Sequence, residues 1–336
     1  MRITRFSSFK DTEVFFTAAF SGHDITFVPD PLSPETAALA RDADIVSVFV
    51  DCDVSKETIA ALPNVKLIVT ESTGVDHIDM AYAKERGITV ANVPGYGMNA
   101  VAEFTFGLLL NLSRNIAFAS DQVREQGIFD VRAFQGFDLF GKTLGVVGTG
   151  RIGMHVIELA RGFGMDVVAF DVHPNPERAT ALGFSYATLP DLAASADAIT
   201  LHVPYLPETH HLIDADIFRV MKKGVILINT ARGEVVDTIA LVEAIKSGRV
   251  AGAGLDVLEG EHELHTGKDV LANVPEGHDL RPLLGDRMLM DMPNVIVTPH
   301  IAFHSKEADQ DRVSKAVQII KDYLAAASRD ASTPVG

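Results

Sequence analysis

The segment 141–174 constrains the fold of this chain more than any other stretch. Residues 144–147 form an apolar run that is too short for a helix and suits a buried parallel strand. Gly148, Gly150 and Gly153 follow with the spacing G-x-G-x-x-G. In a dinucleotide-binding turn the first glycine permits the tight turn, the second lets a pyrophosphate approach the backbone, and the third allows close packing of helix on strand.

The residues after the glycines extend this pattern. Positions 152–164 carry apolar side chains at helical spacing, so the free N–H groups at the start of that helix would face the phosphates. Residues 166–170 are typical of a second strand, and Asp171 follows directly. A carboxylate there accepts hydrogen bonds from both ribose hydroxyls of NAD and repels the additional phosphate of NADP. Glycine-rich turns alone are common, but the strand, helix and acid together predict a site for NAD.

Length and composition define the broad class of protein. The chain has 336 residues, 47% of them hydrophobic, which suits a globular protein of two domains. Its formal net charge of −16 argues against nucleic acids and anionic membrane surfaces as partners. The single cysteine, Cys52, excludes an internal disulfide, and we interpret it as a buried or bystander thiol in a reducing compartment. The N-terminal residues lack the apolar core of a signal peptide, and no apolar run reaches the roughly 18 residues of a membrane span, so a cytoplasmic protein is expected.

Residues 1–98 alternate short apolar strands with helical segments, which predicts a parallel sheet covered by helices. No glycine-rich phosphate loop occurs in this part, so we expect an open, flavodoxin-like α/β domain with a different role. A long apolar helix is expected at 99–114, after a hinge predicted at Pro94, Gly95 and Gly97. The strands expected in this domain are 2–6, 25–28, 45–49, 67–69 and 88–91, and two of its helices are expected at 34–41 and 79–86.

The alternation resumes after Asp171 and predicts a doubly wound, Rossmann-type sheet. Residues 259–293 interrupt it with mixed polar residues, glycine and proline, and a connection this long is usually functional. A final helix at 305–327 is expected to return to the first domain. The prediction is therefore a discontinuous substrate domain, 1–99 and 301–336, around a dinucleotide-binding domain at 100–300. The further strands expected are 198–202, 225–229, 250–256 and 294–298, with helices at 214–221 and 238–246.

Three of these strands end next to residues that could do chemistry. Arg232 follows the strand 225–229, Glu261 follows 250–256, and His300 follows 294–298. Ligands collect at the carboxyl ends of parallel strands. Taken singly, Arg232 could be a surface ion-pair residue, His300 a core histidine and Glu261 a solvated acid. Together they suit carbonyl reduction: Arg232 would hold a carboxylate and polarise a ketone, His300 would supply the proton, and Glu261 would orient His300 and support its charged form. The other histidines lack ligand spacing, so no metal is predicted.

The motifs resemble those of the D-isomer-specific 2-hydroxyacid dehydrogenase family, and most closely its D-lactate dehydrogenase branch. The resemblance rests on the fingerprint, on Asn-Thr-Ala-Arg-Gly at 229–233, on Gly-Leu-Asp-Val-Leu-Glu-Gly-Glu at 254–261 and on Thr-Pro-His-Ile-Ala-Phe at 298–303. It extends over the first domain through 73–79 and 93–100. His304, where that branch often has an aromatic residue, and Gly97-Met98, in place of a small residue and proline, depart from the pattern and affect the shape of the pocket.

The resemblance implies a catalytic set of Arg232, Glu261 and His300. It also implies that backbone N–H groups near Thr73 and Gly74 bind the substrate carboxylate, with Tyr96 and Phe303 at the substrate pocket. The cofactor residues, from the fingerprint and the resemblance together, are Gly148, Gly150, Arg151, Ile152, Gly153, Asp171, Val203, Pro204, Thr209, Thr230, Ala231 and Asp256.

We therefore predict an NAD-dependent enzyme that reduces a small 2-keto acid, such as pyruvate, to the D-2-hydroxy acid, and that forms a homodimer. One alternative is a glyoxylate or hydroxypyruvate reductase of the same family, although such enzymes often place a tryptophan after the catalytic histidine and this chain has none. Phosphoglycerate dehydrogenases commonly carry an added regulatory domain, for which no residues remain here. Another alternative is a non-catalytic NAD(H)-sensing protein on the same fold, which can retain the Arg-Glu-His set but usually has long polar tails.

Overall fold

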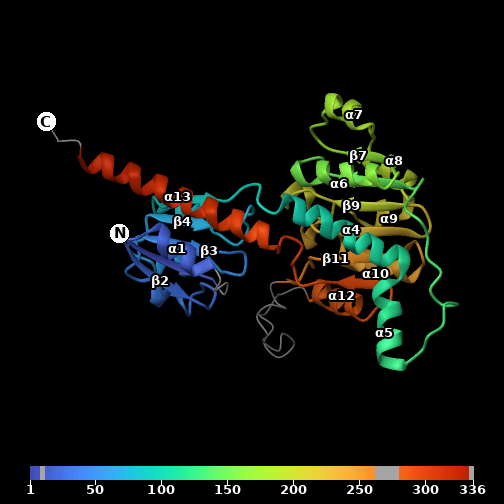
Figure 1. The fold of residues 1–336 in the computed structure, drawn as a ribbon, viewed down its shortest axis with the longest axis horizontal. Helices are drawn as coiled ribbons and strands as arrows, with labels where there is room; N and C mark the ends of the chain where they lie inside the picture. The colour runs from blue at the N-terminus through green and yellow to red at the C-terminus, as the bar shows by residue number, and fades with distance from the viewer. Residues whose placement is uncertain (8–11, 262–279, 333–336) are drawn as a thin grey trace. The chain divides into compact units, whose positions relative to one another are not determined.

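The computed structural model describes residues 1–7, 12–261 and 280–332, and the chain divides into two compact units. The first unit comprises Met1–Gly97 and His304–Gly336, and the second comprises Met98–Phe303. The first unit is discontinuous, because the chain leaves it at Gly97 and returns to it at His304 (Figure 1). No helix in these described ranges is long and apolar enough to cross a membrane.

In its described residues the first unit contains a five-stranded sheet in the order β2-β1-β3-β4-β5, with every neighbouring pair parallel. This order is the flavodoxin-like variant of the doubly wound fold. The strands are β1 (Arg2–Phe6), β2 (Asp24–Val28), β3 (Ile45–Val48), β4 (Leu67–Thr70) and β5 (Thr89–Asn92). The helices are α1 (Glu13–Ala19), α2 (Lys56–Ala60), α3 (Met80–Glu85) and, after the second crossing, α13 (Lys306–Ser332).

The helix predicted at 34–41 is present only as the four-residue 3-10 helix η2 (Ala37–Ala40). The hydroxyl of Thr36 accepts from the Ser33 N–H at 2.8 Å and donates to the Pro31 carbonyl at 2.8 Å. Local side-chain bonds of this kind compete with the helical backbone pattern, which is why Ser and Thr favour turns.

A buried cluster of ionised side chains joins the two separated parts of the first unit. Glu71, directly after β4, accepts from Arg5 Nε at 2.6 Å and from Arg312 Nη1 of α13 at 2.7 Å. All three residues are at most 1% exposed. Asp309 also accepts from Arg312, at 3.2 Å. Burial acts to raise the pKa of Glu71, but its hydrogen bonds and the two positive charges outweigh it and hold that pKa below the ordinary value.

The described part of the second unit holds a seven-stranded parallel sheet in the order β12-β11-β10-β9-β6-β7-β8. The strand order reverses between β6 and β9, which is where an open α/β sheet binds its ligand. The sequence predicted all of these strands except β8, which has only two residues. The strands are β6 (Thr143–Val147), β7 (Asp166–Phe170), β8 (Ser185–Tyr186), β9 (Ala198–Leu201), β10 (Val225–Asn229), β11 (Val250–Leu255) and β12 (Val295–Val297).

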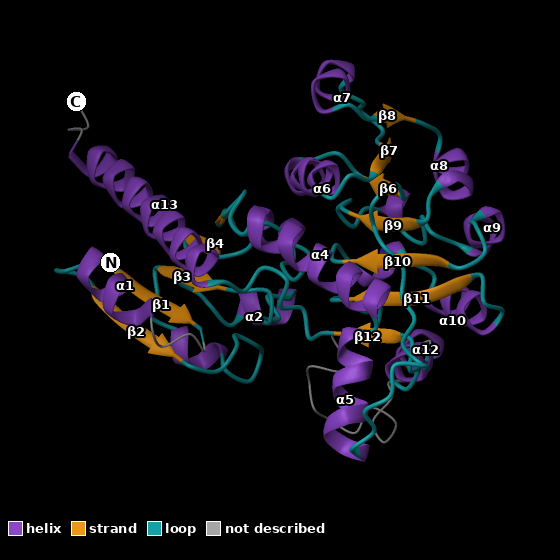
Figure 2. Cartoon of the chain, turned by 45° about the vertical axis from the view of Figure 1, so that its right-hand side comes forward, coloured by secondary structure: helices purple, strands orange, loops and turns teal. Residues whose placement is uncertain are grey.

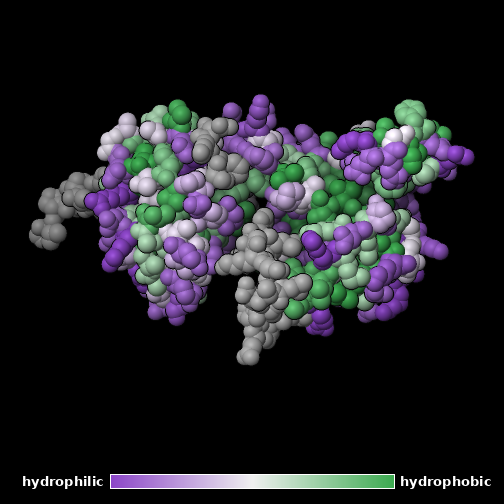
Figure 3. Space-filling view, turned by 90° about the horizontal axis from the view of Figure 1, so that it is seen from below, coloured by the Kyte–Doolittle hydropathy of each residue, from purple (hydrophilic) through white to green (hydrophobic). Residues whose placement is uncertain are grey.

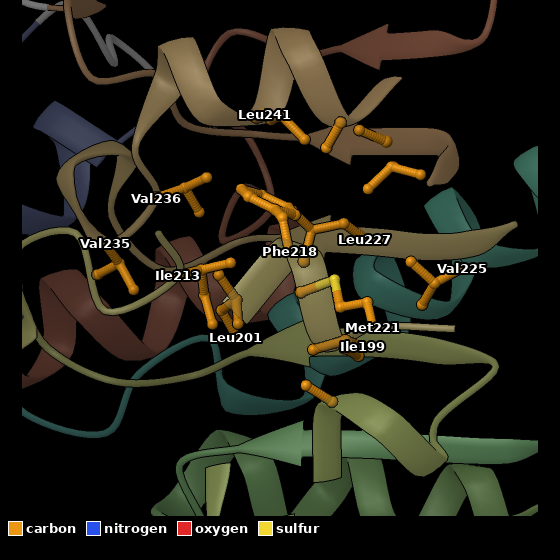
Figure 4. Close-up of a cluster of buried hydrophobic side chains, with 14 of the residues drawn as sticks. Ile199, Leu201, Ile213, Phe218, Met221, Val225, Leu227, Val235, Val236 and Leu241 are labelled. Carbon is orange, nitrogen blue, oxygen red and sulfur yellow. The ribbon is translucent and has the colours of Figure 1, made fainter. Parts of the chain in front are cut away.

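Helices cover both faces of this sheet (Figure 2). The apolar helix α4 (Met98–Arg114) belongs to this unit and packs with α6 (Arg151–Gly162) over the sheet. On the other face, α9 (Ala215–Val220) and α10 (Thr238–Lys246) enclose a core with β9 and β10 (Figure 4). The remaining helices are α5 (Ile116–Gln126), α7 (Pro176–Leu182), α8 (Leu189–Ser195), α12 (Arg281–Met290) and the 3-10 turns η3 (Pro207–Thr209) and η4 (Gly233–Val235).

The interruption predicted at 259–293 contains a helix in its described part. Residues 262–279 lie outside the described residues. The remainder includes α12, which the sequence pattern did not predict and whose Leu289 is buried in the core of the second unit. Pro282 stands in the first turn of α12, where the missing N–H has no helical partner in any case.

Candidate active site

The fingerprint loop has the geometry that a pyrophosphate group needs. Gly148 has φ +94°, and a Cβ there would lie 2.6 Å from the His202 carbonyl oxygen. A Cβ on Gly153 would lie 2.0 Å from the Gly148 carbonyl oxygen, so helix α6 can approach the loop only with glycine at this position. Gly150 is different, because a Cβ there would meet nothing within 4 Å. Gly150 is also the N-cap of α6 and offers no side-chain cap, so the first N–H groups of the helix can take an anion from outside.

The predicted cofactor residues lie at the carboxyl edge of one sheet. The fingerprint joins β6 to α6, and Asp171 directly follows β7. Thr230 follows β10, where its hydroxyl lies 3.0 Å from that of Thr105 on α4. Val203 and Pro204 follow β9, Thr209 ends η3, Ala231 follows Thr230, Asp256 directly follows β11, and Arg151 and Ile152 begin α6.

Arg232 is presented by a turn that Asn229 stabilises. Asn229, 1% exposed at the end of β10, donates from Nδ2 to the Arg232 carbonyl at 2.8 Å. Its Oδ1 accepts from the Ala231 N–H at 3.0 Å. The side-chain amide therefore makes hydrogen bonds to a backbone carbonyl and a backbone N–H of the turn, and it fixes the backbone that carries the guanidinium.

His300 and Glu261 form a direct pair. His300 Nδ1 lies 3.0 Å from Glu261 Oε1, and because an ionised carboxylate can only accept, Nδ1 is the donor. The Leu258 N–H donates to the other carboxylate oxygen at 3.3 Å. Burial acts to raise the pKa of Glu261, but the bond and charge of His300, the Leu258 N–H and the positive charge of Arg232 together lower that pKa below its ordinary value. Glu261 is thus ionised, is bonded directly to His300, and experiences the positive charge of Arg232.

The backbone of His300 is left-handed, with φ +53°. This conformation is unfavourable for a non-glycine residue and persists only where the surroundings impose it. Asp256 supplies the restraint. Its carbonyl accepts from the His300 N–H at 2.8 Å, and its carboxylate accepts from the Thr298 hydroxyl at 2.6 Å, the Ile301 N–H at 2.9 Å and the Ala302 N–H at 2.7 Å. Burial nevertheless raises the pKa of Asp256 above its ordinary value.

Comparisons with known proteins agree with this geometry. The family model for the D-isomer specific 2-hydroxyacid dehydrogenase, NAD binding domain, matches residues 106–302. The chain is 42% identical over 289 residues to 2-hydroxyacid dehydrogenase homolog 1 of Schizosaccharomyces pombe, covering 85% of this chain and 84% of that protein. It is 36% identical over 308 residues to the aromatic 2-oxoacid reductase of Clostridium sporogenes, covering 90% of this chain and 89% of that protein. The crystal structure of D-lactate dehydrogenase from Aquifex aeolicus, complexed with NAD and lactic acid, superimposes with a TM-score of 0.84 at 34% identity, covering 97% of this chain and 96% of the other.

The chain belongs to the D-isomer-specific 2-hydroxyacid dehydrogenase family. It is accordingly an NAD-dependent oxidoreductase that acts on a CH–OH group, and its cofactor is NAD.

The predicted substrate residues of this dehydrogenase belong to different units. In the second unit, the ring of Phe303 packs edge-on against His300, with centroids 6.2 Å apart. In the first unit, Thr73 donates its hydroxyl to the Val93 carbonyl at 3.1 Å, and Asn92 Nδ2 donates to the Thr73 carbonyl at 2.7 Å. Ser72 donates to the Gly74 carbonyl at 2.7 Å, which fixes the turn that follows Glu71.

Several residues that support the dehydrogenase site were not identified from the sequence. Asn229 and Thr298 act through hydrogen bonds to backbone, and only their positions at strand ends could have indicated them. His202, directly after β9, has a buried Nδ1 with no hydrogen-bond partner among the described residues. Burial alone lowers its pKa to about 3, so His202 is neutral beside the fingerprint loop. Its position directly before the predicted cofactor residue Val203 was the available signal.

Proposed function

We propose that the enzyme reduces a small 2-keto acid to the D-2-hydroxy acid with NADH, and that pyruvate is among its good substrates. The observation that supports this proposal most strongly is the pairing of His300 Nδ1 with Glu261 at 3.0 Å, beside the charge of Arg232. Because Nδ1 is engaged, the proton for the keto oxygen would come from Nε2 of His300. Bound NADH would supply the hydride to the ketone carbon.

The other side chains would divide the remaining work. The guanidinium of Arg232 would hold the substrate carboxylate and polarise the ketone, a two-point contact that an ammonium group cannot reproduce. Ionised Glu261 would keep His300 in the orientation and charge state that protonation of the alkoxide requires. Backbone N–H groups near Thr73 and Gly74 would bind the carboxylate from the first unit.

The size of the substrate is proposed from the aromatic residues. Phe303 lies against His300, so the substituent of a keto acid that reacts there would meet an aromatic face. Tyr96 is the second aromatic residue predicted for this pocket. A pocket of this kind accepts short aliphatic and aromatic substituents, because one methylene changes transition-state binding by only about 1–3 kcal/mol. An aromatic 2-keto acid is therefore the second candidate, as the relative from Clostridium sporogenes suggests.

A panel of keto acids tests the proposal. We expect NADH oxidation with pyruvate, slower or comparable oxidation with 2-ketobutyrate and phenylpyruvate, and poor use of 3-phosphohydroxypyruvate. Clear preference for glyoxylate or hydroxypyruvate would favour the reductase alternative. Chiral chromatography of the product should show the D acid, and a predominantly L product would contradict the proposed orientation of the substrate.

We also propose that the enzyme is a homodimer whose interface includes α5 and the segment after it. No residue of α5 is buried, and Ile116 and Val123 of this helix are exposed, as are Phe129 and Val131 beyond it. Apolar surface is also visible on the second unit in Figure 3. Clustered apolar surface of this kind marks interfaces, and a two-fold pair of identical chains is the commonest way to cover it.

Light scattering of the purified protein tests this dimer. The expected mass is that of two chains, and the double variant Phe129→Asp, Val131→Asp should be monomeric. Val14→Asp, which places the same charge on an exposed apolar position of α1 in the first unit, should remain dimeric. A monomeric unmodified protein would contradict the proposed interface.

The proposed location is the cytoplasm. The only cysteine, Cys52, is 3% exposed, and burial raises its pKa to about 12. Such a thiol is inert and suits a compartment in which disulfides are not used for stability. Fractionation of the source cells, with the enzyme in the soluble fraction, is the expected result.

A further inference from the structure

Both carboxylate oxygens of Asp171 accept hydrogen bonds from neighbouring groups of the protein itself. Oδ2 accepts from the Thr149 N–H at 2.7 Å and from the Thr149 hydroxyl at 2.8 Å. Oδ1 accepts from the His173 N–H at 2.8 Å. Burial acts to raise the pKa of Asp171, but these bonds outweigh it and lower that pKa below the ordinary value, so the group is a carboxylate at neutral pH. The fingerprint loop and the segment after β7 are thus joined through one side chain.

The direction of the hydrogen bonds around Thr149 follows from the donors and acceptors available. The Thr149 oxygen lies 2.9 Å from the Tyr186 hydroxyl oxygen. Because Thr149 gives its only proton to a carboxylate that cannot donate, it must accept from Tyr186. The Tyr186 oxygen in turn accepts from the Asn175 N–H at 3.1 Å. A single chain of hydrogen bonds, each with a defined donor, therefore runs from Asn175 through Tyr186 and Thr149 to Asp171.

Tyr186 is placed by the fold to hold two segments at once. It is the last residue of β8, which pairs with β7 through Ala169, and its ring packs against Phe184 with centroids 5.2 Å apart. Asn175 is the N-cap of α7, so the hydroxyl of Tyr186 restrains the turn 172–175 that follows Asp171. This turn borders the position at which Asp171 would meet the adenosine ribose, where NADP carries its additional phosphate.

We propose that Tyr186 is a specificity-determining residue for NAD over NADP, acting as a positioning residue through Thr149 and Asp171. The inference rests on the assignment of Asp171 to the ribose of the cofactor. With the hydroxyl in place, the carboxylate is fixed toward the ribose and the turn 172–175 cannot withdraw to admit a phosphate. Without it, Thr149 loses the donor that orients its hydroxyl toward Asp171, and the turn 172–175 loses its bond at Asn175. The carboxylate and the turn are then held less firmly, so the electrostatic and steric penalty on NADP falls.

Equilibrium titration of NADH and NADPH fluorescence tests the proposal without relying on turnover. Tyr186→Phe removes only the hydroxyl and keeps the ring against Phe184. We expect the ratio of the NADPH to the NADH dissociation constant to fall by about five-fold, equivalent to about 1 kcal/mol. Tyr82→Phe, in α3 of the first unit, is the matched control and should leave the ratio unchanged. Asp171→Ala should lower the ratio of the NADPH to the NADH dissociation constant further.

A double-mutant cycle tests whether Tyr186 acts on the cofactor preference through Thr149. If Tyr186 acts through Thr149, then Tyr186→Phe should change the ratio much less in a Thr149→Val background than in the unmodified protein. An unchanged ratio in Tyr186→Phe, whether both cofactors bind as before or both weaken equally, overturns the proposal and leaves only a structural role. Failure of the unmodified protein to bind NADH would overturn the cofactor assignment itself, and the two failures are therefore distinct.

Discussion

Arg312 Nη1 donates to Glu71 Oε2 over 2.7 Å, although the two residues are 241 positions apart in the sequence. Arg5 also donates to Glu71, from Nε at 2.6 Å, and all three side chains are buried in the first unit. Buried charges of this kind are tolerated only while every member keeps its partners, since the loss of one leaves an uncompensated charge.

Glu71→Gln should therefore destabilise the protein strongly. We expect a loss of about 3–5 kcal/mol in the free energy of unfolding, measured with urea at pH 7, because two guanidinium groups would remain buried beside a neutral amide. Glu85→Gln, at an exposed position of α3, is the control and should change little. Because the pKa of Glu71 is lowered in the folded state, its contribution is present above the ordinary glutamate value and is lost as the pH falls through the lower folded value. The difference between variant and unmodified protein should shrink over that acidic range, and a constant difference would count against ionisation of Glu71.

His300→Ala should remove the proton donor and leave the cofactor site intact. Proton transfer from a positioned side chain contributes roughly 10² to 10⁴-fold, so kcat for pyruvate reduction should fall by that factor. The dissociation constant of NADH, measured by fluorescence, should change little. His155→Ala on the surface of α6 serves as the control. Retained activity in His300→Ala would assign the proton to another group.

Glu261→Gln should move the pH profile of reduction to lower pH. A carboxylate in general favours the protonated form of an imidazole that donates to it, and reduction requires a proton on the imidazole. Glutamine can accept the same hydrogen bond from His300 without the charge. Since the pKa of Glu261 is lowered, the carboxylate is ionised throughout the neutral range in which activity is measured. The measurement is kcat/KM for pyruvate against pH. A profile that stays in place would show that the charge of Glu261 does not act on His300.

Asp256→Asn should impair catalysis although the substitution is nearly isosteric. An amide nitrogen would replace one of the two oxygens that accept from residues 298–302, so one donor would face another. The left-handed backbone at His300 would then lose part of its restraint. A displacement of about 1 Å can cost on the order of 10²-fold in rate, which is the loss of kcat that we expect. Asp291→Asn, exposed at the end of α12, should keep full activity, and equal activity of both variants would show that the Asp256 carboxylate is not needed for positioning.

The sequence indicated the elements that repeat a local pattern and missed those that depend on distant contacts. Alternating apolar strands and helices predicted both parallel sheets, because strands buried on both faces are continuously apolar. Strand β8 was missed because two residues carry no period, and α12 was hidden within a polar stretch. Sequence patterns also failed to identify supporting residues around the site whose contacts form only in the folded protein. Neither the left-handed backbone of His300 nor the bond from Tyr186 to Thr149 can be seen in the local sequence.

The discontinuity of the first unit sets an order of events during synthesis. The residues of the second unit form one continuous stretch, Met98–Phe303, and can pack as soon as they have left the ribosome. The first unit emerges earlier but stays incomplete, because Glu71 then has Arg5 beside it but lacks its second guanidinium, which arrives only with residue 312. Until then the strands beside α13 keep exposed the apolar surface that this helix covers in the finished unit. Helix α13, which is synthesised last, would therefore complete the unit whose strands are synthesised first. A chaperone would be most useful to the nascent enzyme between the synthesis of these strands and that of α13.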